Sequence, residues 1–413
     1  EFRALLRDAS LLRLRSDVPV GAYLSGGLDS STIAALVRES GVGHLDTFSI
    51  SFSDPHFDES VYQKQMATLL GTEHQVVHAT YEDIGEAFPE VVWHTEAPLL
   101  RTAPAPMFLL SKLVRDQKYK VVLTGEGADE FLAGYDIFKE AKIRRFWADQ
   151  PKSKFRSLPL KRIYPDIQAF RETNIAYLSA FFGRGLTDTH SRSYSHFLRW
   201  QNGQRLCRFL ADQPGANTAV SEPRYPDAFN AWGDLQRAQF LEISIFLSQY
   251  LLSSQGDRVA MAHSVEGRYP FLDERVIRFC NRLPARFKLR ALKDKFLLRR
   301  AAEGLLPRTI SARPKRPYRA PIRKCFFNDS QSAYVNEVLS SSALSEAGLF
   351  KPAAVEQLVR KAREGSTLGE TDEMGLVGII SSQLLYHQFV RNHRPSRPIG
   401  NRDNVKFVRQ AQE

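Results

Sequence analysis

The sequence has few cysteines and no long apolar run. Its three cysteines, Cys207, Cys280 and Cys325, are far apart in a chain of 413 residues. This pattern argues against a disulfide framework or a zinc site and is typical of a reducing cytoplasm. No apolar stretch approaches the length of a membrane span, and the charged N-terminus lacks the features of a signal peptide. We therefore expect a cytoplasmic protein that has no membrane partner.

The sequence also lacks internal repeats, low-complexity tracts and an initiating methionine. It begins with Glu1, which indicates a piece of a longer protein. What is present is an ordinary globular composition, with 43% hydrophobic and 25% charged residues. A chain of this length and composition can bury a large core in two or three layers.

One turn carries the strongest signal, the sequence Ser25-Gly26-Gly27-Leu28-Asp29-Ser30-Ser31. An apolar stretch typical of a buried parallel strand precedes it, and a helix-forming stretch follows. Glycines let the backbone approach an anion, and a helix N-terminus offers unpaired N–H groups. The three serine hydroxyls add donors, but Asp29 would repel phosphate unless Mg²⁺ lay between them. The turn predicts a Mg²⁺–polyphosphate site, and a plain helix start is the simpler alternative.

Strand and helix signals alternate along the first part of the chain. We expect strands at 18–24, 45–52, 73–78 and 121–124, and helices at 2–15, 32–38, 58–70, 81–93 and 104–116. Such alternation predicts a parallel, doubly wound α/β sheet with ligands at the carboxyl ends of its strands. From about residue 236 the pattern predicts helices at 238–252, 255–262, 275–283, 293–304, 331–339, 353–363 and 374–391. The α/β part then covers about 1–140, and a mostly helical part covers about 141–392.

A second turn, Thr124-Gly125-Glu126-Gly127-Ala128-Asp129-Glu130, follows the fourth expected strand. Three carboxylates in one turn repel one another, and the usual reason to gather them is a divalent cation or acid–base chemistry. A solvated acidic turn is the alternative. It is the weaker interpretation, because Asp29 follows another strand of the same expected sheet.

The 25–31 turn resembles the pyrophosphate loop of the ATP pyrophosphatase (PP-loop) family, and it lacks the Gly-Lys-Ser or Gly-Lys-Thr of a Walker A loop. Together with the 124–130 turn and three later stretches, it resembles the synthetase domain of glutamine-dependent asparagine synthetases. Those stretches are 265–273, 293–301 and 313–318. The resemblance covers roughly residues 1–390. β-Lactam synthetases and lasso-peptide cyclases are similar, so the motifs leave the substrate open.

The resemblance implies an ATP-dependent amide synthetase that uses ATP and Mg²⁺. Such an enzyme adenylates a carboxylate, aspartate or a related acid, releases pyrophosphate and transfers ammonia or an amine. Glu126 would handle the proton of the attacking nitrogen, and Lys315 would contact phosphate oxygens. By its own basic neighbourhood, Lys315 would be a solvated charge. The nucleotide and pyrophosphate would contact Leu24, Ser25, Gly26, Gly27, Asp29, Ser30, Ser31, Ile50, Thr124 and Gly125, and Asp29 and Asp129 would bind the metal.

The acceptor site is suggested by charged residues that suit an amino acid. Arg101 is a natural partner for a carboxylate. Leu99 stands where bacterial asparagine synthetases of this kind have Thr, and that departure leaves aspartate itself open. The other candidates are Asp257, Arg258, Glu266 and Arg268, for which a structural ion-pair network is an equal alternative.

The family normally carries an N-terminal glutaminase whose first residue is a nucleophilic cysteine. This chain begins with Glu1 and its cysteines are interior, so we expect ammonia or an amine to come from a glutaminase outside this chain or from another source. The other expected partners are a small-molecule carboxylate and a second copy in a homodimer. A cyclase or amidotransferase of secondary metabolism is the main alternative.

The net charge of +11 raises nucleic-acid binding as a competing hypothesis. The charge is spread, with its densest patch at 139–162 and a basic tail at 393–413. A PP-loop tRNA-modifying enzyme would need a cysteine pair for sulfur transfer, and the acidic 124–130 turn argues against RNA. A non-catalytic nucleotide-binding scaffold is less favoured, because Asp29, Asp129 and Lys315 are all present. We therefore expect no nucleic-acid partner.

Overall fold

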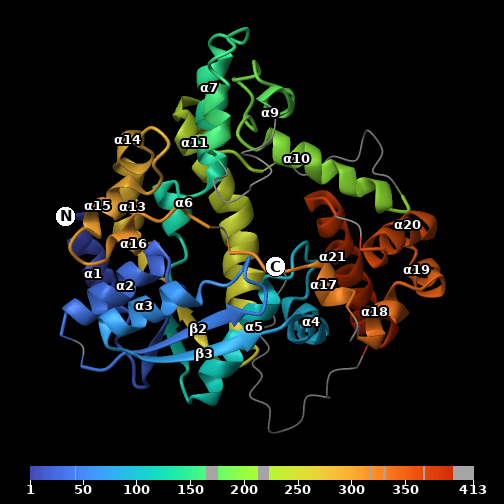
Figure 1. The fold of residues 1–413 in the computed structure, drawn as a ribbon, viewed down its shortest axis with the longest axis horizontal. Helices are drawn as coiled ribbons and strands as arrows, with labels where there is room; N and C mark the ends of the chain where they lie inside the picture. The colour runs from blue at the N-terminus through green and yellow to red at the C-terminus, as the bar shows by residue number, and fades with distance from the viewer. Residues whose placement is uncertain are drawn as a thin grey trace, which may run out of the picture.

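A single parallel sheet forms the centre of the protein, which we describe from a computed structural model (Figure 1). The structure describes residues 1–41, 43–163, 175–212, 223–316, 318–328, 332–365 and 368–393. The sheet has the order β3-β2-β1-β4-β5, and each neighbouring pair is parallel. Its strands are β1 (Val20–Tyr23), β2 (Asp46–Phe52), β3 (Glu73–Ala79), β4 (Val121–Leu123) and β5 (Glu266–Arg268).

The strand order reverses between β1 and β4. In an open α/β sheet, the loops that leave two such strands diverge to opposite faces and open a crevice at the carboxyl edge. The 25–31 turn leaves β1 and the 124–130 turn leaves β4. Both turns singled out in the sequence therefore lie at this switch point.

Helices cover both faces of the sheet, as expected for a doubly wound α/β fold. Apolar side chains of β1 and β4 pack on one face against α1 (Phe2–Leu12), α2 (Leu28–Glu39), α3 (Ser60–Leu70) and α13 (Glu274–Arg282). On the other face, Phe48 and Val122 pack against α5 (Pro104–Asp116) and α12 (Arg258–Met261). Next to α5 lies α4 (Tyr81–Thr95).

The second half of the chain is mostly helical, and its helices from α17 (Arg323–Phe326) to α21 (Glu370–Leu385) are grouped at one side in Figure 1. A continuous helical run is made by α11 (Asp234–Leu241), the π-helix η4 (Glu242–Asp257) and α12. The predicted break between two helices near residue 253 is therefore wrong. The remaining elements are α6 (Ala128–Leu132), α7 (Asp136–Ala148), η1 (Leu158–Arg162), α9 (Ile175–Phe182), α10 (Phe197–Gln204), η2 (Arg205–Phe209), η3 (Asp227–Ala231), η5 (Pro270–Leu272), α14 (Ala285–Lys288), α15 (Phe296–Ala301), α16 (Arg308–Ser311), α17 (Arg323–Phe326), α18 (Ala333–Val338), α19 (Ser341–Ala347), α20 (Pro352–Arg363), α21 (Glu370–Leu385) and η6 (Tyr386–Arg391).

The observed elements confirm the predicted α/β class, with a doubly wound sheet followed by a mostly helical half. All four predicted strands are present, and α3 ends at Gly71 in the left-handed conformation. The sequence did not predict β5, whose three residues come shortly after the helix α12. Within the described residues, no helix is long and apolar enough to cross a membrane. Apart from His393, the expected basic tail lies outside the described residues.

Candidate active site

The 25–31 turn is a tight passage from β1 into α2. Gly26 has φ +69°, and a Cβ there would lie 2.6 Å from the Cβ of Tyr62, so glycine is required for both conformation and space. The hydroxyl of Ser30 accepts a hydrogen bond from the Ser25 amide at 3.2 Å and lies 3.0 Å from the Ser25 hydroxyl. Gly27 caps α2 without a side-chain hydrogen bond. The turn therefore presents hydroxyls beside the N-terminus of a helix.

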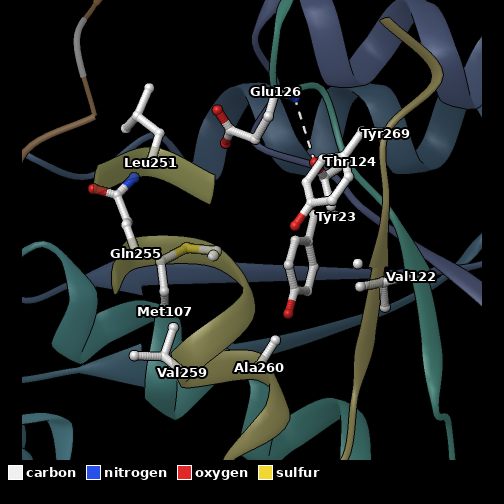
Figure 2. A pocket seen from close by; sticks show the side chains of 12 residues that line it. Tyr23, Met107, Val122, Thr124, Glu126, Leu251, Gln255, Val259, Ala260 and Tyr269 are labelled. Carbon is white, nitrogen blue, oxygen red and sulfur yellow. Dashed lines mark hydrogen bonds between the residues drawn. The ribbon is translucent and has the colours of Figure 1, made fainter. Parts of the chain in front are cut away.

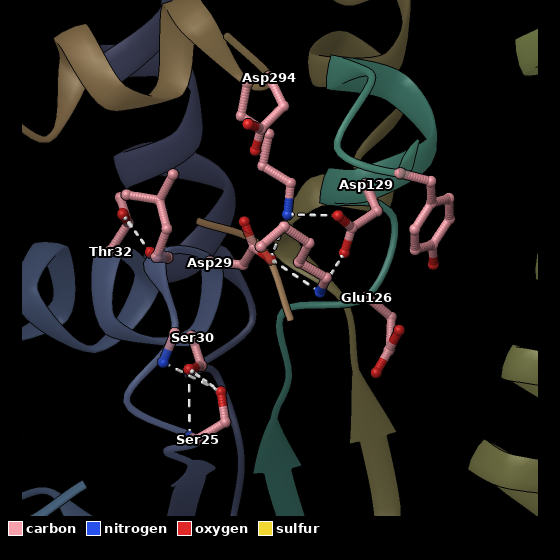
Figure 3. Close-up of polar contacts among 12 residues, drawn as sticks. Ser25, Asp29, Ser30, Thr32, Glu126, Asp129 and Asp294 are labelled. Atoms are coloured by element: carbon pink, nitrogen blue, oxygen red, sulfur yellow. Dashed lines mark hydrogen bonds and ion pairs between the residues drawn. The ribbon is translucent and has the colours of Figure 1, made fainter. Parts of the chain in front are cut away.

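The 124–130 turn packs directly against the first turn. A Cβ at Gly125 would lie 3.0 Å from the Cβ of Asp29 and 3.1 Å from the amide nitrogen of Ser30. Gly127 has φ +94° and precedes α6, which carries Asp129. The two turns thus meet at the switch point, and the carboxylates of Asp29 and Asp129 face the same space (Figure 3).

Two lysines from the second half of the chain reach these two aspartates. Lys295 Nζ lies 2.5 Å from Asp29 Oδ2 and 2.6 Å from Asp129 Oδ1. Lys315 Nζ lies 2.7 Å from Asp129 Oδ2 and 4.0 Å from Asp29 Oδ2. Burial opposes the charged form of Lys315, but Asp129 and Asp29 outweigh it and raise its pKa. Burial likewise tends to raise the pKa of Asp129, and Lys295 and Lys315 bring it below its ordinary value.

The two glutamates of the second turn behave differently from Asp129. Burial, with the charges of Asp129 and Asp29 and despite the opposing effect of Lys315, raises the pKa of Glu126 to about 7. Burial and the charges of Asp129 and Glu126 raise the pKa of Glu130 to about 8. Glu130 is fully buried and accepts a hydrogen bond from the Tyr135 hydroxyl at 2.8 Å. In Figure 3, the carboxylate of Glu126 points away from the Asp29–Asp129 pair.

The buried side chain of Arg299 connects the two chain segments that carry Lys295 and Lys315. Its guanidinium donates to the carbonyl oxygens of Ser311 at 2.7 Å and Arg313 at 2.9 Å, and to Asp294 Oδ2 at 2.8 Å. Asp294 immediately precedes Lys295, and Arg313 is two residues before Lys315. Arg299 therefore fixes the start of α15 relative to the segment that carries Lys315. A cavity lies over the first turn at this point, lined by Ser25, Gly27, Asp29, Lys295, Lys315 and Tyr318 among others.

A second cavity, which Glu126 lines, lies between the sheet and the helices of its second face (Figure 2). Glu126 and Thr124 lie at one end, and Val259 and Ala260 lie at the other. Its remaining lining includes Tyr23, Met107, Val122, Leu251, Gln255 and Tyr269. No cationic side chain is among its lining residues in the described part of the chain. Glu126 therefore lines the mostly apolar cavity and is not among the described residues that line the charged one.

Leu24 and Thr124 directly follow β1 and β4 at the carboxyl edge of the sheet, whereas Ile50 lies inside β2, two residues before the strand ends. The amide of Leu24 donates to the Phe48 carbonyl at 2.9 Å, and the Ile50 carbonyl accepts from the Gln63 side chain at 2.8 Å. The amide of Thr124 donates to the carbonyl of Arg268 at 2.9 Å. Ser31 is buried, and its hydroxyl has no hydrogen-bond partner among the described residues.

The structure does not bring the five acceptor candidates into one cluster. Arg101 lies 3.7 Å from Glu370, and Arg258 pairs with Glu96 at 2.9 Å. Asp257 accepts a hydrogen bond from the hydroxyl of Tyr269, a residue of the second cavity.

The other two acceptor candidates lie together on β5. Arg268 donates to Glu266 at 2.7 Å, and to the carbonyls of Arg13 and Arg15 at 2.7 and 2.8 Å. These contacts join β5 to the segment that follows α1. An acceptor role for any of the five candidates stays a prediction.

Two residues beside the Asp29–Asp129 pair were not singled out from the sequence. Lys295 lies in the 293–301 stretch, but a lysine before a short helix that itself contains two arginines has no local mark of a site. Gly134 follows the second turn, and its Cβ would lie 2.0 Å from Asp129 Oδ1. Its position after an acidic turn was the only signal that could have indicated such a close approach.

Comparison with known proteins decides the family. The family model described as asparagine synthase matches residues 1–386. The chain belongs to the asparagine synthase family. A protein of Mycobacterium bovis, named provisionally as a glutamine-hydrolysing asparagine synthetase, is 32% identical over 373 residues, which are 89% of this chain and 54% of that protein. The predicted resemblance is thereby confirmed.

Two further relatives show the spread of the family. Asparagine synthetase 1 of Bacillus subtilis, also named glutamine-hydrolysing, is 29% identical over 83% of this chain and 52% of its own length. The amidase chyE of Penicillium rubens is 26% identical over 91% of this chain and 59% of its own length. The chain thus spans about half the length of the curated relatives it matches.

Proposed function

We propose that this chain is the ATP-dependent part of an amide-forming enzyme. It would adenylate a carboxylate, release pyrophosphate and transfer ammonia or an amine to the activated carbonyl. The observation that carries the proposal is the meeting of the 25–31 turn, Asp129 and Lys315 at one edge of the sheet, with Glu126 of the 124–130 turn lining the apolar cavity.

The charged cavity suits a polyphosphate. The helix N-terminus at Gly27 and the hydroxyls of Ser25, Ser30 and Ser31 would donate to phosphate oxygens. Lys315 would stabilise the charge that develops as pyrophosphate leaves, because an ammonium group held in place costs no reorganisation at that moment. Leu24, Gly26, Ile50, Thr124 and Gly125 would line the nucleotide at the edge of the sheet.

Asp29 and Asp129 fit a magnesium site by their chemistry. Carboxylate oxygens are the ligands that Mg²⁺ prefers, together with phosphate oxygens. Asp29 Oδ1 is buried and has no hydrogen-bond partner among the described residues, as expected for an oxygen that serves a cation. A bound Mg²⁺ would neutralise pyrophosphate charge. The two aspartates would orient it between the turns that leave β1 and β4.

Glu126 is suited to accept a proton from the attacking nitrogen. A base with a pKa of about 7 can take a proton at neutral pH and release it again. The apolar cavity beside Glu126 offers no cation among its described lining residues, so it suits a neutral molecule such as ammonia or an amine. The nitrogen would then reach Glu126 from this cavity.

The acceptor would be aspartate or a related acid. A second candidate function is an amidotransferase or cyclase of secondary metabolism, and it is favoured by Leu99 beside Arg101 and by the similarity to a fungal protein named as an amidase. The whole protein would include a glutaminase part, as the names of the longer relatives indicate, and would act in the cytoplasm as a homodimer.

Pyrophosphate release tests the proposal. The chain is incubated with ATP, Mg²⁺, ammonium and a panel of carboxylic acids, and AMP and pyrophosphate are measured. We expect both products in equal amounts with at least one acid, aspartate first among them. Release of ADP and phosphate, or of neither product pair with any acid, would contradict the proposal.

A further inference from the structure

We propose that Lys295 makes the Asp29–Asp129 pair select a metal–polyphosphate complex over a free divalent cation. The inference rests on the proposed function in that it takes this pair to be the metal site. The positive charge of Lys295 would repel a free cation and attract a complex that carries net negative charge. Lys295 thereby differs from Lys315, which the proposed function assigns to the reaction itself.

The position of Lys295 is fixed by its backbone and by burial. It is the N-cap residue just before α15 and has φ 46°, in the left-handed region that residues with a side chain rarely adopt. Its side chain is 2% exposed, and its ammonium group contacts one oxygen of each aspartate. A long side chain that is buried so completely loses most of its rotamer freedom, so its charge stays between the two carboxylates.

Within the described part of the chain, the carboxylates that form ion pairs with Lys295 are those of Asp29 and Asp129. Asp294, next to Lys295 in the chain, is already paired with Arg299 at 2.8 Å and with Lys139 at 3.4 Å. Gly134 approaches from another side, since a Cβ there would lie 2.1 Å from the Cε of Lys295. The ammonium therefore lies at the wall of the charged cavity, paired with Asp29 and Asp129.

The count of charges explains the selectivity. Two carboxylates and two ammonium groups sum to zero, so a free divalent cation meets little net attraction at this site. A metal bound to pyrophosphate carries net negative charge and gains from both lysines. Lys315 is on an irregular segment and its side chain is 23% exposed, whereas Lys295 is held inside. Lys295 is therefore the lysine whose positive charge stays in place beside the two aspartates.

Metal titration of the nucleotide-free chain tests the inference directly. Mn²⁺ binding is measured by electron paramagnetic resonance, and binding of inorganic pyrophosphate in the presence of Mg²⁺ is measured by calorimetry. For Lys295→Gln we expect the Kd of Mn²⁺ to fall about tenfold, because one repelling charge is gone. We expect the Kd of Mg²⁺–pyrophosphate to rise about tenfold, so the two affinities move in opposite directions.

Matched variants separate this role from a structural one. Lys293→Gln removes an exposed lysine two residues away and is expected to change neither Kd by more than about twofold. Lys295→Met should reproduce Lys295→Gln. Parallel weakening of both ligands, no change in either, or loss of the circular dichroism of the fold in both Lys295 variants would overturn the inference. If the opposite shifts occur in a chain that makes no AMP, the inference stands and the proposed function fails.

Discussion

Gly134 lies directly against the carboxylate of Asp129. A Cβ at this position would come within 2.0 Å of Asp129 Oδ1 and 2.1 Å of Lys295 Cε. The φ of Gly134 is not in the left-handed region, so space and not backbone conformation excludes a side chain here. One missing methyl group therefore permits an ion pair between a residue of the first half of the chain and one of the second.

Gly134→Ala should displace this ion pair while leaving the rest of the sheet intact. A shift of about 1 Å at a reacting centre can lower the rate about 100-fold, and we expect a loss of that order in pyrophosphate release. Crowding should also lower the free energy of unfolding by about 1–3 kcal/mol. Gly203→Ala is the control, because no atom lies within 4 Å of its added Cβ. Equal activity in the two variants would contradict the close approach.

Glu126→Gln should separate the two halves of the reaction. We expect nitrogen transfer to fall about 10²–10⁴-fold, because the proton acceptor is lost, while ATP–pyrophosphate exchange continues. In the unmodified chain the base must be deprotonated, so kcat/KM for amide formation should rise with pH through a midpoint of about 7. A pH profile that is flat between 6 and 8, or an equal loss of ATP–pyrophosphate exchange in the variant, would contradict the role of Glu126 as the proton acceptor.

Asp29→Asn and Asp129→Asn should each weaken adenylation strongly. Each replaces a metal-binding carboxylate by an amide, which we expect to cost about 2–4 kcal/mol of transition-state stabilisation. The activity of either variant should respond more steeply to added Mg²⁺ than that of the unmodified chain. Near-normal pyrophosphate release at low Mg²⁺ in both variants would show that the metal is held by other groups.

Lys315→Ala should suppress pyrophosphate release more than it weakens ATP binding. Its ammonium stabilises charge that develops only as the bond to pyrophosphate breaks. Lys315→Arg should recover little activity, because a planar guanidinium does not replace a compact ammonium. Arg319→Ala removes an exposed charge of the same segment and should be mild by comparison. Similar kcat/KM values for the two alanine variants would contradict the proposed role of Lys315 in pyrophosphate release.

Arg144→Met should destabilise the fold without touching the site. The Arg144 guanidinium is 1% exposed and donates to the carbonyls of Phe182 at 3.0 Å, Tyr194 at 2.9 Å and Arg184 at 2.9 Å. Losing this donor leaves buried carbonyls unpaired, and we expect about 3 kcal/mol or more of lost unfolding free energy in urea. Arg145→Met, which removes a side chain that is 39% exposed, should cost less than about 1 kcal/mol.

The sheet could be predicted because its signals are local. Apolar runs end in glycine-rich turns, and the turns after β1 and β4 contain their own anion-binding and acidic residues. The strand β5 has only three residues, and its hydrogen bonds go to a strand more than 140 residues earlier, so no local pattern marks it. Edge strands of this length depend on tertiary pairing for their existence.

Charge was harder to interpret than apolar pattern. The 139–162 segment has the composition of a basic surface, yet Lys139 and Arg144 are buried and pair with other parts of the chain. Lys295 could not be distinguished from a solvated lysine, because its partners are Asp29 and Asp129, far away in the sequence. The roles of the candidate site residues remain predictions until the variants above are measured.

Because Arg299 binds the main chain at residues 311 and 313, the connection between α15 and α16 can vary in length. The guanidinium holds the carbonyls of Ser311 and Arg313, which are main-chain groups that any residue supplies. Between Arg299 and Ser311 the chain passes through a turn at Gly304, where no atom lies within 4 Å of an added Cβ. Residues inserted at this turn would lengthen the connection between α15 and α16 and leave the distance between the two lysines unchanged.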